Sequence, residues 1–129
     1  MKKNLATLCI GMLLALASIV SATSSHARTA QCSIGESVAA KDLPKQGKDT
    51  LALIESGGPF ASERDGIPFS NREKILPKER RGYYREYTVR TPGVKSRGAK
   101  RIVCGGEQTK ADQCYYSDDH YKSFKCIAR

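Results

Sequence analysis

Five titratable side chains in the second half of the sequence could together perform phosphate chemistry. They are two carboxylates, two guanidiniums and one imidazole: Glu73, Glu86, Arg97, Arg101 and His120. Cleavage of RNA without a metal ion needs a base for the 2′-hydroxyl proton and an acid for the departing 5′-oxygen. It also needs cations for the charge that builds up on the phosphorus oxygens, which the planar fork of arginine matches. On this hypothesis Glu86 is the base, His120 is the acid, and the two arginines hold the phosphate.

Other interpretations of these residues stay open at this point. A strand carboxylate is often solvated or ion-paired, single arginines are often surface charges, and a lone histidine in a bend is often structural. Composition and spacing therefore favour a nuclease no more than a cationic binding module. Metal-dependent hydrolysis would need clustered carboxylates or histidines, and a zinc site would need paired cysteines. The sequence holds neither pattern, so we expect no metal and no cofactor.

The strand that would carry Glu86 is predicted over residues 83–90. This segment is rich in aromatic and β-branched residues, and alternation along a strand puts Tyr84, Glu86 and Thr88 on one face. A turn at residues 91–93 leads into a returning strand over residues 97–104. Arg97 and Arg101 would share one face of that strand, so the sequence predicts a carboxylate beside two arginines on a rigid sheet.

The remaining elements are a helix, a loop and two more strands. They are predicted over residues 49–56 (helix, ended by Gly57-Gly58), 67–76 (a binding loop or an ordinary connector), 114–116 and 122–127 (strands). Residues 28–48 look irregular. One short N-terminal helix packed on a twisted antiparallel sheet gives an α+β fold class.

The first 27 residues have the character of a secretory signal peptide. Lys2 and Lys3 precede an apolar run, and small residues lead to a cleavage site after Ala27. A retained membrane anchor is the alternative, but the apolar run is short for a bilayer. We therefore expect one folded domain, residues 28–129, secreted to the periplasm or the outside of the cell.

Four of the five cysteines fall in this domain. An even number in a small secreted domain implies two disulfides, for which three pairings exist. We favour Cys104–Cys114, which would close a hairpin, and Cys32–Cys126, which would tie the two ends together.

The domain is strongly basic. The chain carries a formal charge of +9, and removal of Lys2 and Lys3 leaves 9 − 2 = +7. Such an excess attracts polyanions or anionic surfaces, although it also serves solubility alone.

The order of motifs resembles the microbial guanyl-specific ribonucleases, the family of barnase and ribonuclease Sa. The resemblance covers nearly the whole domain. It rests on the segments 49–51, 58–60, 65–66, 71–73, 76–77, 83–89, 91–93, 97–98, 101–102, 115–116 and 119–121, and on Ile54, Phe69 and Phe124. It implies the microbial ribonuclease fold, with Glu86 as general base, His120 as general acid, and Arg97 and Arg101 on the scissile phosphate.

The resemblance also implies a guanine site. Glu73 would accept the guanine N1 and N2 hydrogen bonds, the backbone amides of Asn71 and Arg72 would reach O6, and Phe69 and Tyr121 would border the base. Single-stranded bases are read by such stacking and edge hydrogen bonds. Adenine offers no donor at N1, so a carboxylate there prefers guanine.

We therefore expect a secreted, monomeric endoribonuclease that cleaves RNA after guanosine through a 2′,3′-cyclic phosphate. A barstar-like acidic inhibitor is an expected partner, and no stable membrane association is expected. The alternative is a disulfide-stapled cationic protein that binds membranes or polyanions without catalysis.

Overall fold

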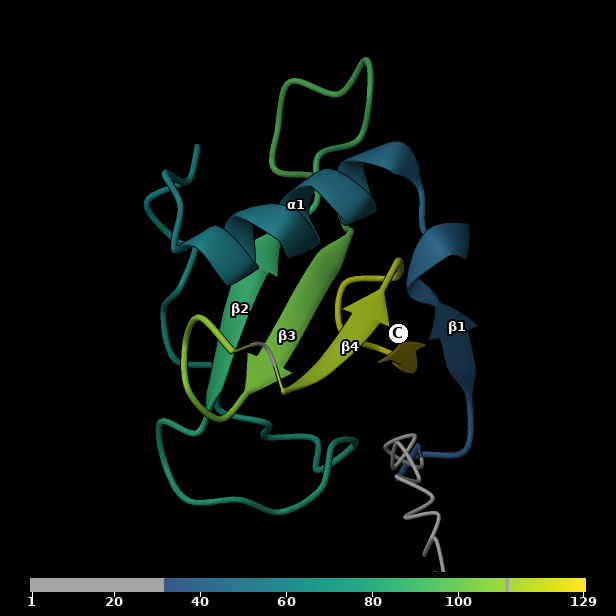
Figure 1. Cartoon of the computed structure of the whole chain (residues 1–129), viewed down its shortest axis with the longest axis vertical. Helices are drawn as coiled ribbons and strands as arrows, with labels where there is room; N and C mark the ends of the chain where they lie inside the picture. The colour runs from purple at the N-terminus through teal and green to yellow at the C-terminus, as the bar shows by residue number, and fades with distance from the viewer. Residues whose placement is uncertain (1–31, 111) are drawn as a thin grey trace, which may run out of the picture.

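The computed structural model describes residues 32–110 and 112–129, so the predicted signal peptide, residues 1–27, lies outside the described residues. In chain order the elements are β1 (Ser37–Ala39), a 3-10 turn η1 (Ala40–Asp42), α1 (Lys45–Ser56), β2 (Tyr84–Thr88), β3 (Arg101–Gly105), β4 (Gln113–Ser117) and β5 (Lys125–Ala128) (Figure 1). Within these ranges, no helix has the length and apolar character needed to cross a bilayer.

The helix α1 begins one turn before the predicted start at residue 49. Pro44 is its N-cap residue. Gly47 is buried, and a Cβ placed at Gly47 would lie 3.4 Å from the Cβ of Leu43. This first turn carries no apolar periodicity, which is why sequence alone did not place it in the helix. The predicted end is confirmed. Gly57 adopts a left-handed φ of 82°, and the amide of Gly58 donates to the Leu53 carbonyl at 2.9 Å.

The five strands form one sheet in the order β1-β5-β4-β3-β2. Strands β2 to β5 are antiparallel, as predicted, but β1 runs parallel to β5 and makes the sheet mixed. No strand is expected from sequence in residues 28–48, so β1 is a correction. Its three residues are too few to show a period, and its partner β5 lies near the other end of the chain.

Three of the predicted strands are shorter in the structure, β2 by one residue at its start and two at its end. β3 begins at Arg101 rather than at residue 97, because residues 97–100 form a bend whose carbonyl oxygens accept hydrogen bonds from the Arg101 guanidinium. β5 begins at Lys125 rather than at residue 122, because the amide of Ser123 is bound to the carboxylate of Asp119. Both arginines still reach the same face, Arg97 from the bend and Arg101 from the strand.

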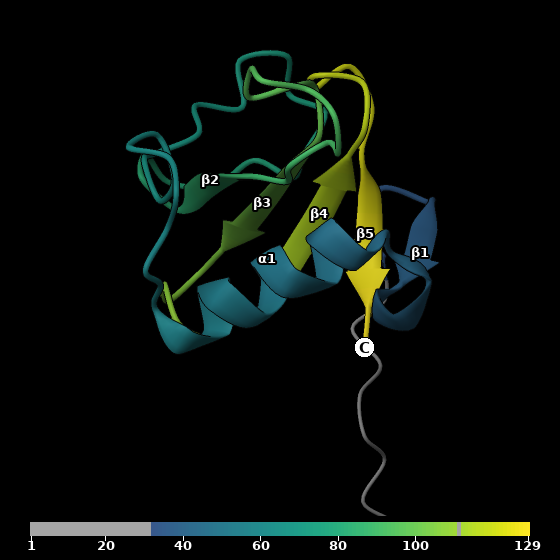
Figure 2. The ribbon, with the colours of Figure 1, turned by 90° about the horizontal axis from the view of Figure 1, so that it is seen from above.

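The sheet separates two apolar layers. One layer lies under α1 and joins Leu51 and Ile54 of the helix to Tyr87, Val89 and Ile102 of the sheet. The layer on the other face contains Tyr84, Val103, Tyr115 and Phe124. Figure 2 shows α1 across one face only, while the loops that precede β2, β3 and β5 gather beyond the other face.

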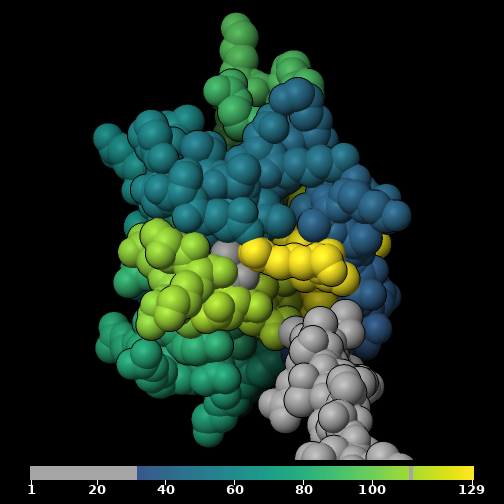
Figure 3. All heavy atoms as spheres, viewed as in Figure 1, coloured from purple at the N-terminus to yellow at the C-terminus, as the bar shows by residue number. Residues whose placement is uncertain are grey.

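Both predicted disulfides are present. Cys104–Cys114 joins directly opposed residues of β3 and β4, and Cys32–Cys126 joins the N-terminal segment to β5 across 94 residues of sequence. The loop between β3 and β4 packs back on the helix end: a Cβ placed at Gly57 would stand 3.6 Å from Cγ2 of Thr109. Figure 3 shows this loop filling the surface directly below α1. The short disulfide therefore fixes a loop that covers the end of the helix.

Candidate active site

The candidate site lies on the sheet face opposite α1, centred on Glu86. Glu86 is the middle residue of β2 and pairs with Val103 of β3, so its position is set by the rigid centre of an antiparallel ladder. Tyr84, Glu86 and Thr88 share this face, as the strand period predicts. The side chain of Glu86 is only 10 % exposed. A carboxylate so buried requires partners for its oxygens.

Both oxygens of Glu86 have partners. Oε1 accepts a hydrogen bond from Nη2 of Arg97 at 3.3 Å, which is also an ion pair. Oε2 accepts a hydrogen bond from the phenol of Tyr121 at 2.8 Å. Burial of the ring, with the hydrogen bond to Glu86 and its negative charge, raises the pKa of Tyr121. The phenol therefore stays protonated and remains a donor at neutral pH.

The two arginines are held by different parts of the chain. Nε of Arg97 donates to the hydroxyl of Thr88 at 2.9 Å, which ties the bend to the end of β2. Arg101 is almost fully buried, and its Nη1 is bound to the carbonyls of Gly98 and Lys100. Its Nε donates to the Tyr121 phenol at 3.0 Å. A guanidinium anchored on one side presents its remaining N–H groups in a fixed direction, which suits binding of a phosphate.

A strained turn between β4 and β5 carries His120. Both His120 and Tyr121 have left-handed backbones, with φ of 58° and 69°. The amide of His120 donates to the carbonyl of Ala99 at 3.1 Å, so the turn is attached to the arginine bend. His120 is exposed, and its ring centroid lies 5.0 Å from that of Tyr121. Strained backbone at two consecutive residues is common at functional sites.

Asp119 stabilises this turn. Its carboxylate accepts hydrogen bonds from the hydroxyl and the amide of Ser123 and from the hydroxyl of Ser117. The bonds from Ser123, followed by that from Ser117, lower the pKa of Asp119 to about 2. The same Ser117 hydroxyl accepts the amide of Tyr121 at 3.0 Å. This network holds the turn in which the Tyr121 phenol lies beside Glu86 and the His120 ring lies beside Tyr121.

An open cleft of ≈ 630 Å³ adjoins the histidine turn. It is lined on one side by the loop before β2 and on the other by the histidine turn: Phe69, Ser70, Asn71, Arg72, Glu73, Ile75, His120, Tyr121, Lys122 and Phe124. All five residues of the expected guanine site are among them. The rings of Phe69 and Tyr121 stack with centroids 5.1 Å apart, which provides a flat aromatic wall.

The side chain of Asn71 has a structural part in this cleft. Its amide nitrogen donates to the carbonyl of Leu76 at 2.8 Å, and its oxygen accepts the Leu76 amide at 3.1 Å. With a left-handed φ of 48°, Asn71 folds residues 71–76 into a compact loop. The side chain is therefore occupied, which leaves the backbone of the loop and the exposed carboxylate of Glu73 to contact a ligand.

The cleft loop is hydrogen-bonded directly to the Glu86 strand. The amide of Glu86 donates to the carbonyl of Ile67, and the amides of Gly66 and Phe69 donate to the carbonyls of Glu86 and Tyr84. This pairing covers the outer edge of β2. It also fixes the spacing between the cleft and the carboxylate, so a bound base and a reacting phosphate would keep a constant separation.

Sequence reasoning missed part of this arrangement. The hydroxyl of Thr88 and the Ser117–Asp119 pair have no motif that marks them as supports of the site. Tyr121 was expected beside the base, but its bond to Glu86 depends on the left-handed turn, which the sequence does not reveal. Among the described residues, no three His, Cys, Asp or Glu side chains are grouped so that they could hold a metal ion.

Comparison with known proteins identifies the family. The ribonuclease family model matches residues 26–128. Guanyl-specific ribonuclease Sa of Kitasatospora aureofaciens is 52% identical over 85 residues, which are 66% of this chain and 85% of that protein. The chain belongs to the microbial guanyl-specific ribonucleases. Membership of this family confirms the resemblance seen in the sequence.

Other members of the guanyl-specific ribonuclease family support the assignment. Guanyl-specific ribonuclease St of Saccharopolyspora erythraea is 48% identical over 90 residues, 70% of this chain and 85% of that protein. Ribonuclease Sa3 of Kitasatospora aureofaciens is 53% identical over 85 residues, which are 66% of this chain but only 58% of that protein. The crystal structure of ribonuclease Sa2 with guanosine-2′-cyclophosphate superposes with a TM-score of 0.65 at 49% identity, covering 71% of this chain and 94% of that one. The α+β fold is thus confirmed.

Proposed function

We propose that this protein is an endoribonuclease that cleaves single-stranded RNA after guanosine without a metal ion. The observation that carries the proposal is the place of Tyr121: its phenol donates to the buried carboxylate of Glu86, and its ring lies 5.0 Å from that of His120, which lines a cleft together with Glu73. Two proton-transfer groups of different type beside an aromatic cleft are what transesterification of RNA requires.

In the first step, ionised Glu86 removes the proton of the guanosine 2′-hydroxyl, and the 2′-oxygen attacks phosphorus. The bond from phosphorus to the 5′-oxygen breaks, and protonated His120 gives its proton to that oxygen. The products are a 2′,3′-cyclic phosphate and a new 5′-hydroxyl end. Arg97 and Arg101 stabilise the negative charge that builds up on the phosphorus oxygens.

In the second step the two groups exchange roles. Neutral His120 removes a proton from water, and the water oxygen attacks phosphorus. The bond from phosphorus to the 2′-oxygen breaks, and Glu86 returns its proton to that oxygen. The product is a 3′-phosphate, and both side chains are back in their starting states.

Specificity follows from the cleft. The guanine would lie along the stacked Phe69 and Tyr121 rings, with its N1 and N2 donors on the Glu73 carboxylate and its O6 on the amides of Asn71 and Arg72. Adenine would leave the Glu73 carboxylate without a donor at N1, which costs binding free energy.

The test is incubation of the purified domain with the dinucleotides GpC and ApC in excess chelator. We expect GpC to give guanosine 2′,3′-cyclic phosphate and then guanosine 3′-phosphate, and ApC to react far more slowly. Binding of RNA without any cleavage would reject the enzyme and favour the cationic binding protein instead.

We also propose that residues 1–27 direct secretion and that the mature domain acts as a monomer. The basic charge supports a further proposal, that an acidic barstar-like protein inhibits the enzyme, because a cationic site attracts a carboxylate-rich partner.

A further inference from the structure

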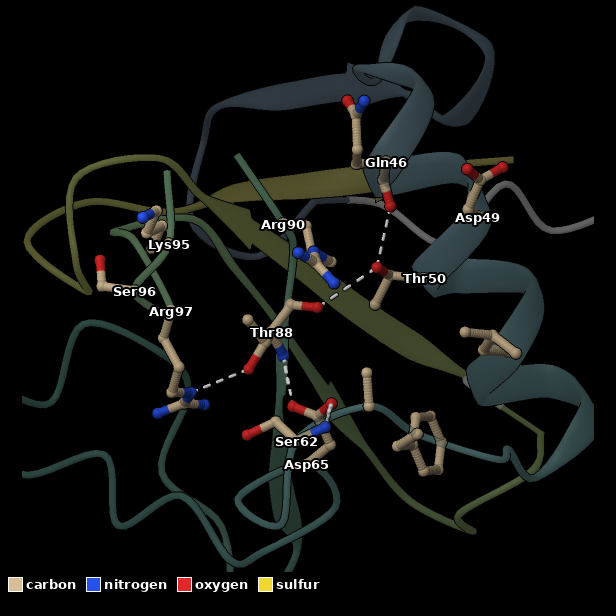
Figure 4. Close-up of a pocket in the computed structure, with 13 residues that line it drawn as sticks. Gln46, Asp49, Thr50, Ser62, Asp65, Thr88, Arg90, Lys95, Ser96 and Arg97 are labelled. Atoms are coloured by element: carbon tan, nitrogen blue, oxygen red, sulfur yellow. Dashed lines mark hydrogen bonds between the residues drawn. The ribbon is translucent and has the colours of Figure 1, made fainter. Parts of the chain in front are cut away.

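A second cleft, of ≈ 380 Å³, lies at the other end of the Glu86 strand. It is bounded by α1, by the segment after the helix and by the segment between β2 and β3. Figure 4 shows Gln46, Asp49 and Thr50 of the helix on one side, and Lys95, Ser96 and Arg97 on the other. It shares no lining residue with the guanine cleft. It meets the proposed catalytic centre at Arg97, whose guanidinium contacts Glu86.

The lining combines an apolar part with a cationic part. Leu53, Phe60 and Ala61 supply the apolar part, and Leu53 is 37% exposed. The cations Arg90 and Lys95 are exposed, and both come from the segment that follows β2. Apolar surface beside cations suits a nucleotide, because the base can pack on the first while the phosphate meets the second.

The acidic side chains of this cleft are already engaged. Asp65 accepts the amide of Thr88 at 2.7 Å, and Asp49 is paired with Lys45 at 2.7 Å (Figure 4 shows the first of these). In the described ranges, by contrast, neither Arg90 nor Lys95 forms an ion pair within 4.0 Å. The uncompensated charge of the cleft is therefore positive, which favours an anionic occupant.

The position of the cleft indicates which nucleotide it would take. In an in-line displacement the attacking 2′-oxygen and the departing 5′-oxygen lie on opposite sides of phosphorus. The departing nucleoside lies at the acid, His120, which lines the guanine cleft. The second cleft instead begins at Thr88 and Arg97, beside Glu86, where the ribose of the cleaved guanosine would lie. The chain on the 5′ side of that ribose is the part of the substrate that can enter it.

We propose that this cleft binds the nucleotide immediately 5′ of the cleaved guanosine, an inference that rests on the proposed ribonuclease function. Arg90 and Lys95 meet the phosphate that joins the two nucleosides, and Leu53 and Phe60 contact the preceding base or ribose. The enzyme would then hold a substrate at three places: the upstream nucleotide, the scissile phosphate and the guanine.

The experiment compares kcat/KM for four substrates: GpC, its 5′-phosphorylated form pGpC, and the isomeric trinucleotides ApGpC and GpCpA. We expect ApGpC to exceed GpC by about five- to tenfold, as two or three solvent-exposed contacts would give. pGpC should fall between them. GpCpA has the same composition and charge as ApGpC, so it separates a 5′ subsite from general attraction of longer RNA.

Variants of the cleft then show which residues cause the rate gain on substrates extended at the 5′ end. Arg90→Ala combined with Lys95→Ala should leave the rate on GpC unchanged and remove the gain on pGpC and ApGpC. Leu53→Ser should reduce only the gain of ApGpC over pGpC. The matched control is Lys41→Ala with Lys48→Ala, which removes two exposed cations that do not line the cleft.

Several outcomes overturn the proposal. The first is an equal kcat/KM for ApGpC and GpC. The second is a gain for GpCpA over GpC as large as the gain for ApGpC. The third is a loss of that gain in the Lys41/Lys48 control as large as in the Arg90/Lys95 variant. Failure to cleave any of the four substrates overturns the ribonuclease function itself, and the inference with it. Cleavage of GpC without a 5′ effect overturns only the subsite.

Discussion

The phenol of Tyr121 lies between Glu86 and Arg101, donating to Oε2 of the carboxylate at 2.8 Å and accepting from Nε of the guanidinium at 3.0 Å. One hydroxyl thus links Glu86, the proposed base, to Arg101, which is proposed to bind the scissile phosphate. Because the aromatic ring also lines the cleft proposed for guanine, two proposed roles meet in one side chain.

Removing that hydroxyl should affect chemistry more than binding. In Tyr121→Phe the ring can still stack on Phe69, but Glu86 and Arg101 lose their shared partner. We expect kcat on GpC to fall about tenfold, the scale of one hydrogen bond to a charged group, with a smaller change in KM. Steady-state kinetics measure both constants, and Tyr83→Phe, which removes a phenol that lines neither cleft, is the control. An unchanged kcat would show that the link is not used.

Glu73→Ala should remove discrimination between bases. The lost hydrogen bonds to a charged acceptor are worth about 1.5–3 kcal/mol each, so kcat/KM on GpC should fall by roughly ten- to a hundredfold per bond. Cleavage of ApC should change little. The ratio of the two rates is the measurement, and a parallel loss on both substrates would remove Glu73 from recognition.

His120 should be needed in both steps. Asn is the better replacement, because it tolerates the left-handed φ of 58° at this position. We expect His120→Asn to slow cleavage of GpC and hydrolysis of guanosine 2′,3′-cyclic phosphate by about 10²–10⁴-fold each. The wild-type pH profile should be bell-shaped, because the first step needs the base without its proton and the acid with its proton. Near-normal rates in a folded variant would contradict this mechanism.

Asp119 should contribute stability that depends on pH. Its pKa is lowered to about 2 in the folded state by the Ser123 and Ser117 hydrogen bonds. A carboxyl whose pKa falls on folding stabilises the fold above its unfolded value, about 3.9, and loses that contribution as pH falls toward the folded value. We therefore expect Asp119→Asn to lower the free energy of unfolding at pH 7, with the difference shrinking between about pH 4 and pH 2.

Urea unfolding at a series of pH values measures this difference. Asp118→Asn removes the same charge from the exposed neighbouring residue and is the matched control. A loss at pH 7 that persisted undiminished at pH 2 would mean that Asp119 acts through shape rather than through charge.

The parts of this structure that follow from local pattern were predictable from sequence. Strand β2 shows its alternation in five residues, and Gly57 marks the helix end. Arg97 was placed on the correct face for the wrong reason: it reaches Glu86 from a bend held by Thr88 and Gly98, not from a strand. The parts that depend on distant pairing, such as β1 against β5, leave no local pattern. The same holds for the Tyr121 phenol, whose direction is set by two left-handed residues.

The position of β5 in the sheet determines when the nascent chain can complete its fold. Among the described residues β5 is the last strand in chain order, yet it lies between β1 and β4, and Cys126 within it closes the bond to Cys32. A nascent chain that lacks residues 125–128 cannot complete the sheet or attach its N-terminal segment. Contacts of such long sequence separation form late in folding. We expect a nascent chain to assemble its ribonuclease site only after residues 125–128 have left the ribosome, so RNA near a shorter nascent chain meets no active enzyme.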